Sequence, residues 1–522
     1  MPTDILDQEI MTWGATHWTL RDAMSGTQIF GGTGSGKTSG SGQHLALKFL
    51  EAGLGGLVLT VKPDETETWR RYAAATKRAD DLILLGPRIN DSRPYSFNFL
   101  EYERKFVGED TALFTENVVN LFTAVMEVSQ RGEGAGIQNA GFWINAARQM
   151  LRNTVDLLLL TGESLTFSNA HEVITTAPTS IELARKMIAE KETASYCVTL
   201  LKELAALSSR HPRADDIGTV GNYWLHRFSN MGHEERSGVV SMFTTVADPF
   251  IRGILKPLFS ASKEQPQARP ELCREGKIIL VDMPVKQYFE LGQFSQVLYK
   301  LIWQRAMERS DFSGEESKPV FLWADEAQFF ISSRDMLFQT TARSANVATV
   351  YLTQSLSNYH SIMPGEKGKA ETDALLANLQ TKIFHASSDT VTNVWAAELL
   401  GKEYQQITSR STQSGTQGEG KTRNWGSWFW LGAGTDYSYS STANTSEELR
   451  YRVMPSAFTQ LKRGGKLSKL LVEAIICCTG AKENFGKVGF TQKRLAGIGP
   501  VPAYDSSSAT AQSKKPPPLP KE

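Results

Sequence analysis

A glycine-rich stretch near the amino end constrains this chain more than any other feature. Residues 27–42 read TQIFGGTGSGKTSGSG, in which Gly31, Gly36, Lys37 and Thr38 fit the spacing G-x-x-x-x-G-K-[ST]. Glycines in such a loop let consecutive backbone N–H groups turn toward one anion, and a helix that begins there adds its positive dipole end. The short segment "QIF" before the loop is typical of the strand that leads into a phosphate-binding site. The alternative is a glycine-rich surface turn that matches by chance.

If the loop binds phosphate, its side chains have distinct expected tasks. The Lys37 ammonium reaches the β- and γ-phosphates, and the Thr38 hydroxyl ligates magnesium. The cofactors expected from this motif are therefore ATP and Mg²⁺. The expected nucleotide-binding residues are Gly31, Gly32, Thr33, Gly34, Ser35, Gly36, Lys37 and Thr38.

An acidic pair much later in the chain supplies what hydrolysis needs beyond nucleotide binding. In "VFLWADEAQFF", Asp325 and Glu326 follow an apolar run that is typical of a buried strand. Asp325 is a candidate to hold the magnesium together with Thr38, and Glu326 is a candidate general base for the attacking water. The alternative is that the two carboxylates are simply the charged end of a strand.

Two further polar residues flank the next predicted strand, Val347–Leu352. Arg343 lies in the turn before it and is a candidate to reach the nucleotide of a neighbouring subunit, whereas Gln354, just beyond it, is a candidate to sense the γ-phosphate. Either residue could instead be an ordinary surface or strand-end side chain. Lys62 and Asp64 in "VKPDE" are either nucleotide contacts or solvated charges.

The overall composition limits the class of protein. The chain has 522 residues, enough for two or three domains, and its 56 Lys+Arg balance its 56 Asp+Glu, so net charge does not indicate a nucleic-acid partner. The four cysteines show no metal-ligand spacing, which fits a reducing compartment. Because no apolar run approaches the ~20 residues of a membrane helix, we expect a cytoplasmic protein.

The pattern of apolar runs predicts an α/β fold with an insertion. Four unbroken runs, "GLVLTV", "KIILVD", "PVFLWA" and "VATVYL", are typical of strands buried on both faces of a parallel sheet, and helical stretches lie between them. The middle of the chain contains helical runs without a convincing buried strand. The predicted parts are a nucleotide-binding α/β domain at 1–100 and 266–480, an all-α insertion at 101–265, a flexible Ser/Thr/Gly-rich segment at 405–449 and a disordered tail at 501–522.

The ordered set of motifs resembles the conjugative coupling proteins of type IV secretion systems, the TraD/TraG family, within the HerA/FtsK superfamily of motors. The resemblance rests on the phosphate loop, "TVKPDE", "WADEAQFF", "ARSANVATVYLTQS" and "YRVMPSAFTQL", which follow the family's order over residues 31–480. It implies a RecA-like P-loop NTPase domain with a mostly parallel sheet and an inserted all-helical domain. One departure is that better-known members begin with a transmembrane region, whereas no such run precedes residue 31 here.

The resemblance also implies an activity. The family couples ATP hydrolysis to DNA translocation and delivers a DNA or relaxase–DNA substrate to a conjugative channel. Carried over to this sequence, it implies magnesium coupling at Asp325, catalysis by Glu326 with Lys37, sensing by Gln354 and a trans contact from Arg343 in a homo-hexamer. Implied partners are DNA, relaxase or relaxosome proteins, and channel or small membrane anchor proteins that recruit the chain to the inner membrane face.

Two alternatives stay open from the sequence. The first is a HerA/FtsK-like DNA motor that acts in repair, segregation or phage defence. The second is a receptor module in which nucleotide only assembles the ring and the helical insertion recruits protein cargo.

Overall fold

The computed structural model describes most of the chain. The described residues are 5–87, 95–108, 110–129, 140–190, 194–207, 213–259, 266–310, 318–363, 365–415 and 438–492. The predicted tail at 501–522 and the aromatic cluster "NWGSWFW" lie outside them. In the described part of the chain, no helix combines the length and apolar character needed to cross a membrane.

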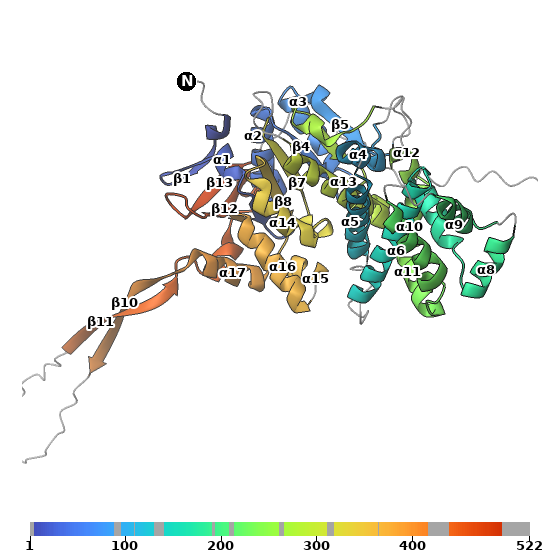
Figure 1. Ribbon diagram of the computed structural model, residues 1–522. Helices are drawn as coiled ribbons and strands as arrows, with labels where there is room; N and C mark the ends of the chain where they lie inside the picture. Colours follow the sequence, from blue (N-terminus) through green and yellow to red (C-terminus); the bar gives the residue numbers. More distant parts are fainter. Residues whose placement is uncertain are drawn as a thin grey trace, which may run out of the picture.

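A nine-stranded sheet forms the centre of the molecule, with the strand order β13-β12-β9-β3-β8-β7-β4-β6-β5 (Figure 1). The seven strands from β9 to β5 are parallel to their neighbours, whereas β12 and β13 are antiparallel at one edge. The predicted α/β class with a mostly parallel sheet is confirmed. The sheet strands are β3 (Thr27–Phe30), β4 (Gly55–Leu59), β5 (Leu82–Leu85), β6 (Ile278–Val281), β7 (Val320–Ala324), β8 (Val347–Thr353), β9 (Thr381–Phe384), β12 (Leu471–Cys478) and β13 (Phe485–Thr491).

Helices cover both faces of the parallel part of this sheet, so the parallel strands are apolar on both sides. In β4, Val58 belongs to the core under one helical layer, while Leu57 and Leu59 point into the core on the opposite face. The first layer includes α2 (Gln43–Glu51) and α3 (Glu65–Ala75), next to α1 (Leu20–Ala23) and the hairpin of β1 (Glu9–Trp13) and β2 (Thr16–Thr19). The other layer consists of α13 (Val285–Arg309), α14 (Ser333–Ala342), α15 (Leu356–Ile362), α16 (Gly365–Asn378) and α17 (Thr390–Leu400).

The long middle of the chain forms a helical region beside the sheet (Figure 1). Its described residues between 99 and 259 contain helices but no strand. The chain leaves the sheet and returns to it at one place, where the Ser96 carbonyl accepts a hydrogen bond from the Ala268 amide and the Ser96 amide donates one to the Pro266 carbonyl. The helices are α4 (Phe99–Val107), α5 (Thr111–Ser129), α6 (Ala140–Leu160), α7 (Phe167–Thr175), α8 (Ile181–Ala189), α9 (Tyr196–Ala206), α10 (Ala214–Asn222), α11 (His233–Ile251) and α12 (Leu255–Phe259).

A two-stranded ribbon projects from the body next to α17 (Figure 1). It is formed by β10 (Lys402–Gly415) and β11 (Ser438–Tyr451), whose register runs from Lys402 opposite Tyr451 to Gly415 opposite Ser438. The segment predicted to be flexible, 405–449, overlaps this ribbon, and its described residues pair as antiparallel strands. Their many threonines are compatible with strand geometry, and the segment contains no proline that would interrupt the ladder.

The sheet also continues past residue 480, where the nucleotide-binding domain was predicted to end. β13 pairs with β12 along Leu471–Cys477 and adds an edge strand that ends at Thr491. The sequence of β13, "FGKVGFT", has no unbroken apolar run because only one of its faces is covered. Strands of that kind are not recognised by the pattern that identifies the buried strands.

Candidate nucleotide site

The glycine-rich loop lies at the carboxyl end of β3, between two neighbouring strands. The Gly31 amide donates a hydrogen bond to the Thr353 carbonyl at the end of β8, and the Gly32 amide donates one to the Ala386 carbonyl after β9. Gly34 and Gly36 have φ angles of 69° and 86°, a backbone region that favours glycine. The loop is therefore attached by hydrogen bonds to the ends of β8 and β9. Its backbone angles explain why glycines occur at these positions in the sequence.

Tight packing inside the loop adds a second requirement for glycine. A Cβ atom on Gly31 would lie 2.4 Å from Ser35 Oγ and 2.9 Å from the Cβ of His385. Ser35 is buried, and among the described residues its hydroxyl has no hydrogen-bond partner. A buried hydroxyl without a partner, inside a loop of this backbone shape, fits a site whose missing partner is a bound oxyanion.

The acidic pair predicted to serve this loop does lie next to it. β8 separates β3 from β7, and all three strands end at the same edge, so the end of β7 faces the loop. The Thr38 hydroxyl donates a 2.9 Å hydrogen bond to Asp325 Oδ2, and Lys37 Nζ lies 3.1 Å from Glu326 Oε1. Oxygen ligands from Thr38 and Asp325 are the kind that Mg²⁺ binds, with the remaining positions left to phosphates and water.

Glu326 has an unusual backbone conformation. Its φ and ψ angles are 53° and 52°, in the left-handed region, which costs a non-glycine residue about 1–3 kcal/mol. This turn directs the carboxylate away from the strand axis and toward the loop. Strain at a residue that faces a phosphate-binding loop is typical of a functional position.

Two amide side chains orient the Glu326 carboxylate. Gln354 Nε2 donates to Oε1 at 3.2 Å and Gln328 Nε2 donates to Oε2 at 3.0 Å. Burial alone would raise the pKa of Glu326, but Lys37 and these two hydrogen bonds outweigh it and lower the pKa below its ordinary value. Glu326 is thus held as a carboxylate. Gln354 also accepts a 3.3 Å hydrogen bond from Thr33, which links it to the loop.

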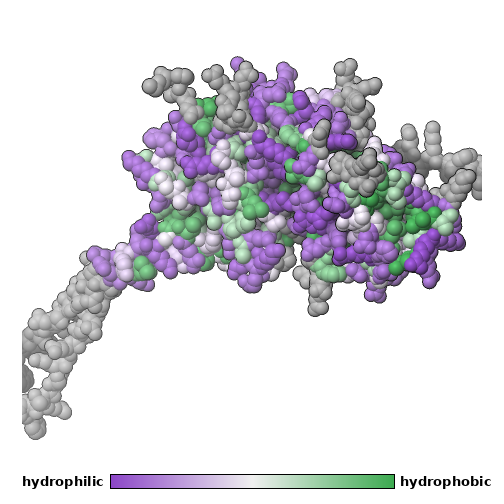
Figure 2. All heavy atoms as spheres, viewed as in Figure 1, coloured by the Kyte–Doolittle hydropathy of each residue, from purple (hydrophilic) through white to green (hydrophobic). Residues whose placement is uncertain are grey.

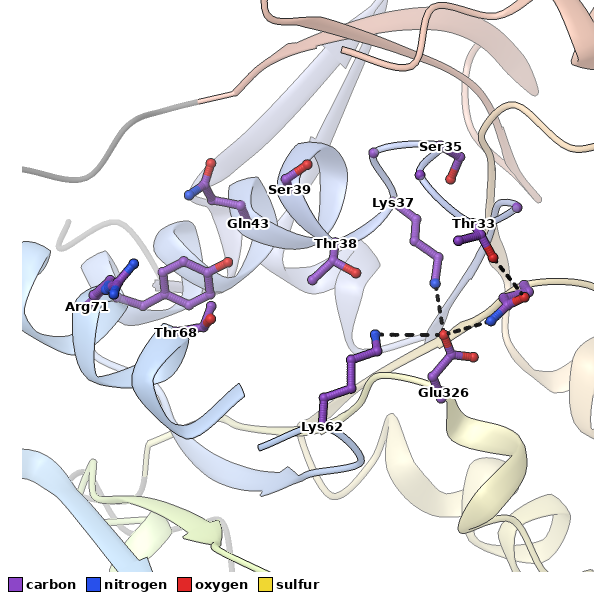
Figure 3. A pocket seen from close by; sticks show the side chains of 15 residues that line it. Thr33, Ser35, Lys37, Thr38, Ser39, Gln43, Lys62, Thr68, Arg71 and Glu326 are labelled. Atoms are coloured by element: carbon purple, nitrogen blue, oxygen red, sulfur yellow. Dashed lines mark hydrogen bonds and ion pairs between the residues drawn. The ribbon is translucent and has the colours of Figure 1, made fainter. Parts of the chain in front are cut away.

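Lys62, for which the sequence left two possibilities open, lies at the site. Its ammonium is 3.9 Å from Glu326 Oε1 (Figure 3). It is also 3.7 Å from Asp325 Oδ2 and 4.0 Å from Glu65 Oε1. Burial raises the pKa of Glu65 to about 8, with a further contribution from Asp325. Asp64 has no comparable contact with the acidic pair. Lys37 and Lys62 therefore both lie next to the carboxylates of Asp325 and Glu326.

The glycine-rich loop, Lys62, Glu326 and Gln354 line a pocket of about 690 Å³, large enough for a nucleotide (Figure 3). Opposite the acidic pair, its wall is formed by Gln43 from α2 and by Thr68, Arg71 and Tyr72 from α3. These four residues were not predicted, because they lie on amphipathic helices without a local motif. Gln328 could have been found, since it follows Glu326 by two positions in "ADEAQ".

Ser41 and His385 form a buried polar contact next to the loop. His385 Nε2 lies 2.6 Å from Ser41 Oγ, and His385 Nδ1 lies 3.1 Å from the Glu473 carbonyl oxygen of β12. Because the ring is buried, the pKa of His385 falls to about 4, so the imidazole is neutral. No local pattern predicts this contact, because it joins segments that are far apart in the chain.

Arg343 does not lie at this site. It is exposed and precedes β8 at the amino end of that strand, while Gln354 follows the carboxyl end. Seven strand residues at ~3.3 Å each separate the two edges by about 20 Å. Any contact of Arg343 with a nucleotide must therefore involve the pocket of another subunit.

Comparisons with known proteins agree with this geometry. Residues 319–456 match the family model described as the TraM recognition site of TraD and TraG. No curated protein matches the chain. The matched segment contains β7, β8 and β9 and therefore the acidic pair.

Solved structures of a coupling protein share the fold over nearly the whole chain. The unbound bacterial conjugative coupling protein TrwBdeltaN70 matches with 15% identity and a TM-score of 0.52, over 93% of this chain and 89% of that one. TrwB in complex with a non-hydrolysable ATP analogue matches with 15% identity and a TM-score of 0.54, over 95% and 92%. TrwB in complex with ADP and Mg²⁺ matches with 14% identity and a TM-score of 0.54, over 93% and 92%. The resemblance predicted from the motifs is confirmed: residues 319–456 match the TraD/TraG coupling-protein family, and the chain has the fold of the coupling protein TrwB.

Proposed function

We propose that this chain is an ATP-driven DNA translocase that couples a DNA or relaxase–DNA substrate to a conjugative type IV secretion channel. The observation that carries the proposal is the meeting of Lys37 and Thr38 with Asp325 and Glu326 at one sheet edge. A loop that only binds nucleotide does not need a charged carboxylate held by two amides beside its lysine. The arrangement supports hydrolysis in addition to binding.

Each residue would have a separate task in this reaction. Lys37 would neutralise phosphate charge, and Thr38 and Asp325 would hold the metal. Magnesium, when bound there with ATP, would withdraw negative charge from the phosphate groups. Glu326, ionised and oriented by Gln354 and Gln328, would accept the proton of the attacking water. The Lys62 ammonium would stay near the acidic pair and add positive charge on the side facing α3.

The comparisons favour coupling over the two alternatives that the sequence left open. The family match covers a segment described as the TraM recognition site of TraD and TraG, and the fold similarity over 93% of this chain is to a conjugative coupling protein. A general DNA motor does not require such a segment. A receptor without hydrolysis does not require Glu326. The ligands named for TrwB, an ATP analogue and ADP with Mg²⁺, support the same cofactors here.

The proposal includes assembly and partners. A homo-hexamer would bring the exposed Arg343 of one subunit toward the pocket of the next, where an arginine typically contributes ~10³–10⁵ in rate. Relaxase or relaxosome proteins would supply the substrate. Channel or small membrane proteins would recruit the ring to the inner membrane face.

The test is the rate of ATP hydrolysis as a function of added DNA. We expect single- or double-stranded DNA to accelerate phosphate release, with an effect that weakens steeply as salt increases because phosphate contacts dominate binding. Glu326→Gln serves as the control that binds nucleotide without turnover. If neither form of DNA changes the rate while a relaxase still binds, the receptor alternative replaces the proposal.

A further inference from the structure

A second cavity lies against β9, away from the nucleotide site. It has a volume of about 930 Å³ and is lined by β9 and by one face each of α15, α16 and α17. All of its lining residues fall within the segment that matches the TraD/TraG family model. The residues of the proposed ATPase reaction do not reach this cavity, so it needs a separate explanation.

A buried cation lines the floor of this cavity. Lys382 lies on β9 between β3 and β12 and is only 4% exposed, yet among the described residues its ammonium forms no hydrogen bond or ion pair. Burial lowers the pKa of Lys382. The Nε2 atom of His360, which also lines the cavity, is buried and has no partner in the described part of the chain. A buried ammonium without an anion is costly, and a carboxylate would offset that cost.

The walls above this floor are apolar and rigid. The Trp395 ring packs edge-on against Phe30 and Phe384 at 5.7 and 5.9 Å, which fixes one side of the cavity. Along the same helix, Val391, Val394 and Leu399 are 48%, 41% and 41% exposed and line the cavity, and their spacing puts them on one face of α17. Figure 2 shows hydrophobic side chains among hydrophilic ones where the ribbon meets the body. The apolar stripe on α17, formed by Val391, Val394 and Leu399, is longer than a compact small molecule would cover.

The rim of the cavity carries the opposite charge from its floor. Glu366 and Asp373 of α16 and Glu398 of α17 are exposed there, with Lys369 as the only exposed base among the lining residues. None of these four side chains forms an ion pair with another described residue. A ligand that enters would therefore meet negative charge first and positive charge at the bottom.

We infer that this cavity is a docking site for a segment of a partner protein that carries a central carboxylate between apolar residues and basic residues on both flanks. The carboxylate would pair with Lys382, the apolar residues would cover Trp395 and the α17 stripe, and the flanking bases would face the acidic rim. Nucleic acid does not fit, because its phosphates would meet three rim carboxylates. The biological meaning of the site rests on the coupling function proposed above, but its binding chemistry does not depend on ATP hydrolysis.

The probe is a fluorescein-labelled heptapeptide, Lys-Leu-Leu-Glu-Leu-Leu-Lys, compared with its neutral analogue that has Gln at the centre. Fluorescence anisotropy with the full chain is expected to show about tenfold tighter binding of the Glu peptide, because only that peptide pairs with the buried ammonium. Lys382→Met is expected to remove this preference. Lys367→Met is the matched control, since Lys367 lies on α16 with its side chain 91% exposed outside the cavity, and it is expected to keep the preference.

A second variant covers the case in which Lys382→Met does not fold. Val394→Glu changes an exposed residue, and it is expected to weaken both peptides because it places a charge in the apolar stripe. The inference is overturned if the unaltered chain binds the two peptides equally or binds neither at millimolar concentration. It is also overturned if the preference survives Lys382→Met, or if Val394→Glu leaves both affinities unchanged. ATP turnover in the same samples reports on the nucleotide site, so a failure of docking and a failure of the proposed ATPase give different results.

Discussion

The hydroxyl of Thr38 donates a 2.9 Å hydrogen bond to Asp325, although 287 positions separate the two residues. The contact exists because β3 and β7 end at the same edge of the sheet, with only β8 between them. It joins the helix that follows the glycine-rich loop to the strand that carries the acidic pair. A metal–triphosphate held by the loop would therefore lie against both carboxylates.

Lys37→Ala should abolish ATP turnover. The substitution removes the ammonium that lies 3.1 Å from Glu326 and that would neutralise phosphate charge, and we expect a loss of ~10²-fold or more in phosphate release. Lys48→Ala, on α2 and paired with Glu51, is the matched control and should retain activity. Unaltered turnover in Lys37→Ala would refute the assignment of the site.

Lys62→Met should increase the affinity of the nucleotide-free chain for a divalent cation. The Lys62 ammonium lies 3.7 Å from Asp325 and 3.9 Å from Glu326, where it competes with a metal for the same carboxylates. Because Lys62 is partly exposed and solvent screens it, we expect a gain of about tenfold. Titration with Mn²⁺ followed by electron paramagnetic resonance measures the effect. An unchanged dissociation constant would argue against competition, and Lys48→Met is the control.

Gln354→Leu should move the acid limb of the pH–rate profile. Gln354 donates one of the hydrogen bonds that lower the pKa of Glu326, so its removal raises that pKa toward the ordinary value. Glu326 is then protonated at higher pH, and kcat/KM should begin to fall at higher pH than in the unaltered chain. We also expect a rate loss of about tenfold at neutral pH. If the rate falls but the acid limb does not shift, Gln354 contacts the substrate and does not lower the pKa of Glu326.

Arg343→Ala should impair hydrolysis without weakening nucleotide binding. Arg343 is exposed at the sheet edge opposite the pocket, so its proposed contact is with a neighbouring subunit. Mixing Arg343→Ala with Glu326→Gln chains should partly restore turnover, because some interfaces then combine an intact arginine with an intact base. Arg252→Ala, on the exposed end of α11, is the control. Absence of rescue in rings of confirmed assembly would count against the trans role.

His385→Asn should reduce the pH dependence of stability. The folded chain keeps His385 neutral with a pKa of about 4, compared with 6.5 as its ordinary value, a difference worth about 3 kcal/mol. The unfolded chain binds the proton first as the pH falls, so this contribution is complete above pH 6.5 and is lost between pH 6.5 and 4. Thermal unfolding of both chains over this range should show a smaller decline for His385→Asn. If the stability of both chains declines equally as the pH falls, groups other than His385 control the loss of stability in acid.

The sequence by itself determined the parts that depend on local spacing. The glycine pattern around Lys37 requires backbone angles that only glycine adopts freely, and the unbroken apolar runs before Asp325 and before Gln354 require strands buried on both faces. Those local rules were sufficient to predict the mostly parallel sheet, the helical insertion and the acidic pair as partners of the loop.

Only the tertiary structure decided which distant side chains share one space. Lys62 became part of the acidic site because β4 is the strand next to β7, and His385 supports the loop because β9 is the strand next to β3. The cavity above Lys382 exists because three short helices pack around the start of β9. Contacts of this kind depend on strand order and helix packing, which bring together residues whose own neighbours in the sequence carry no sign of the contact.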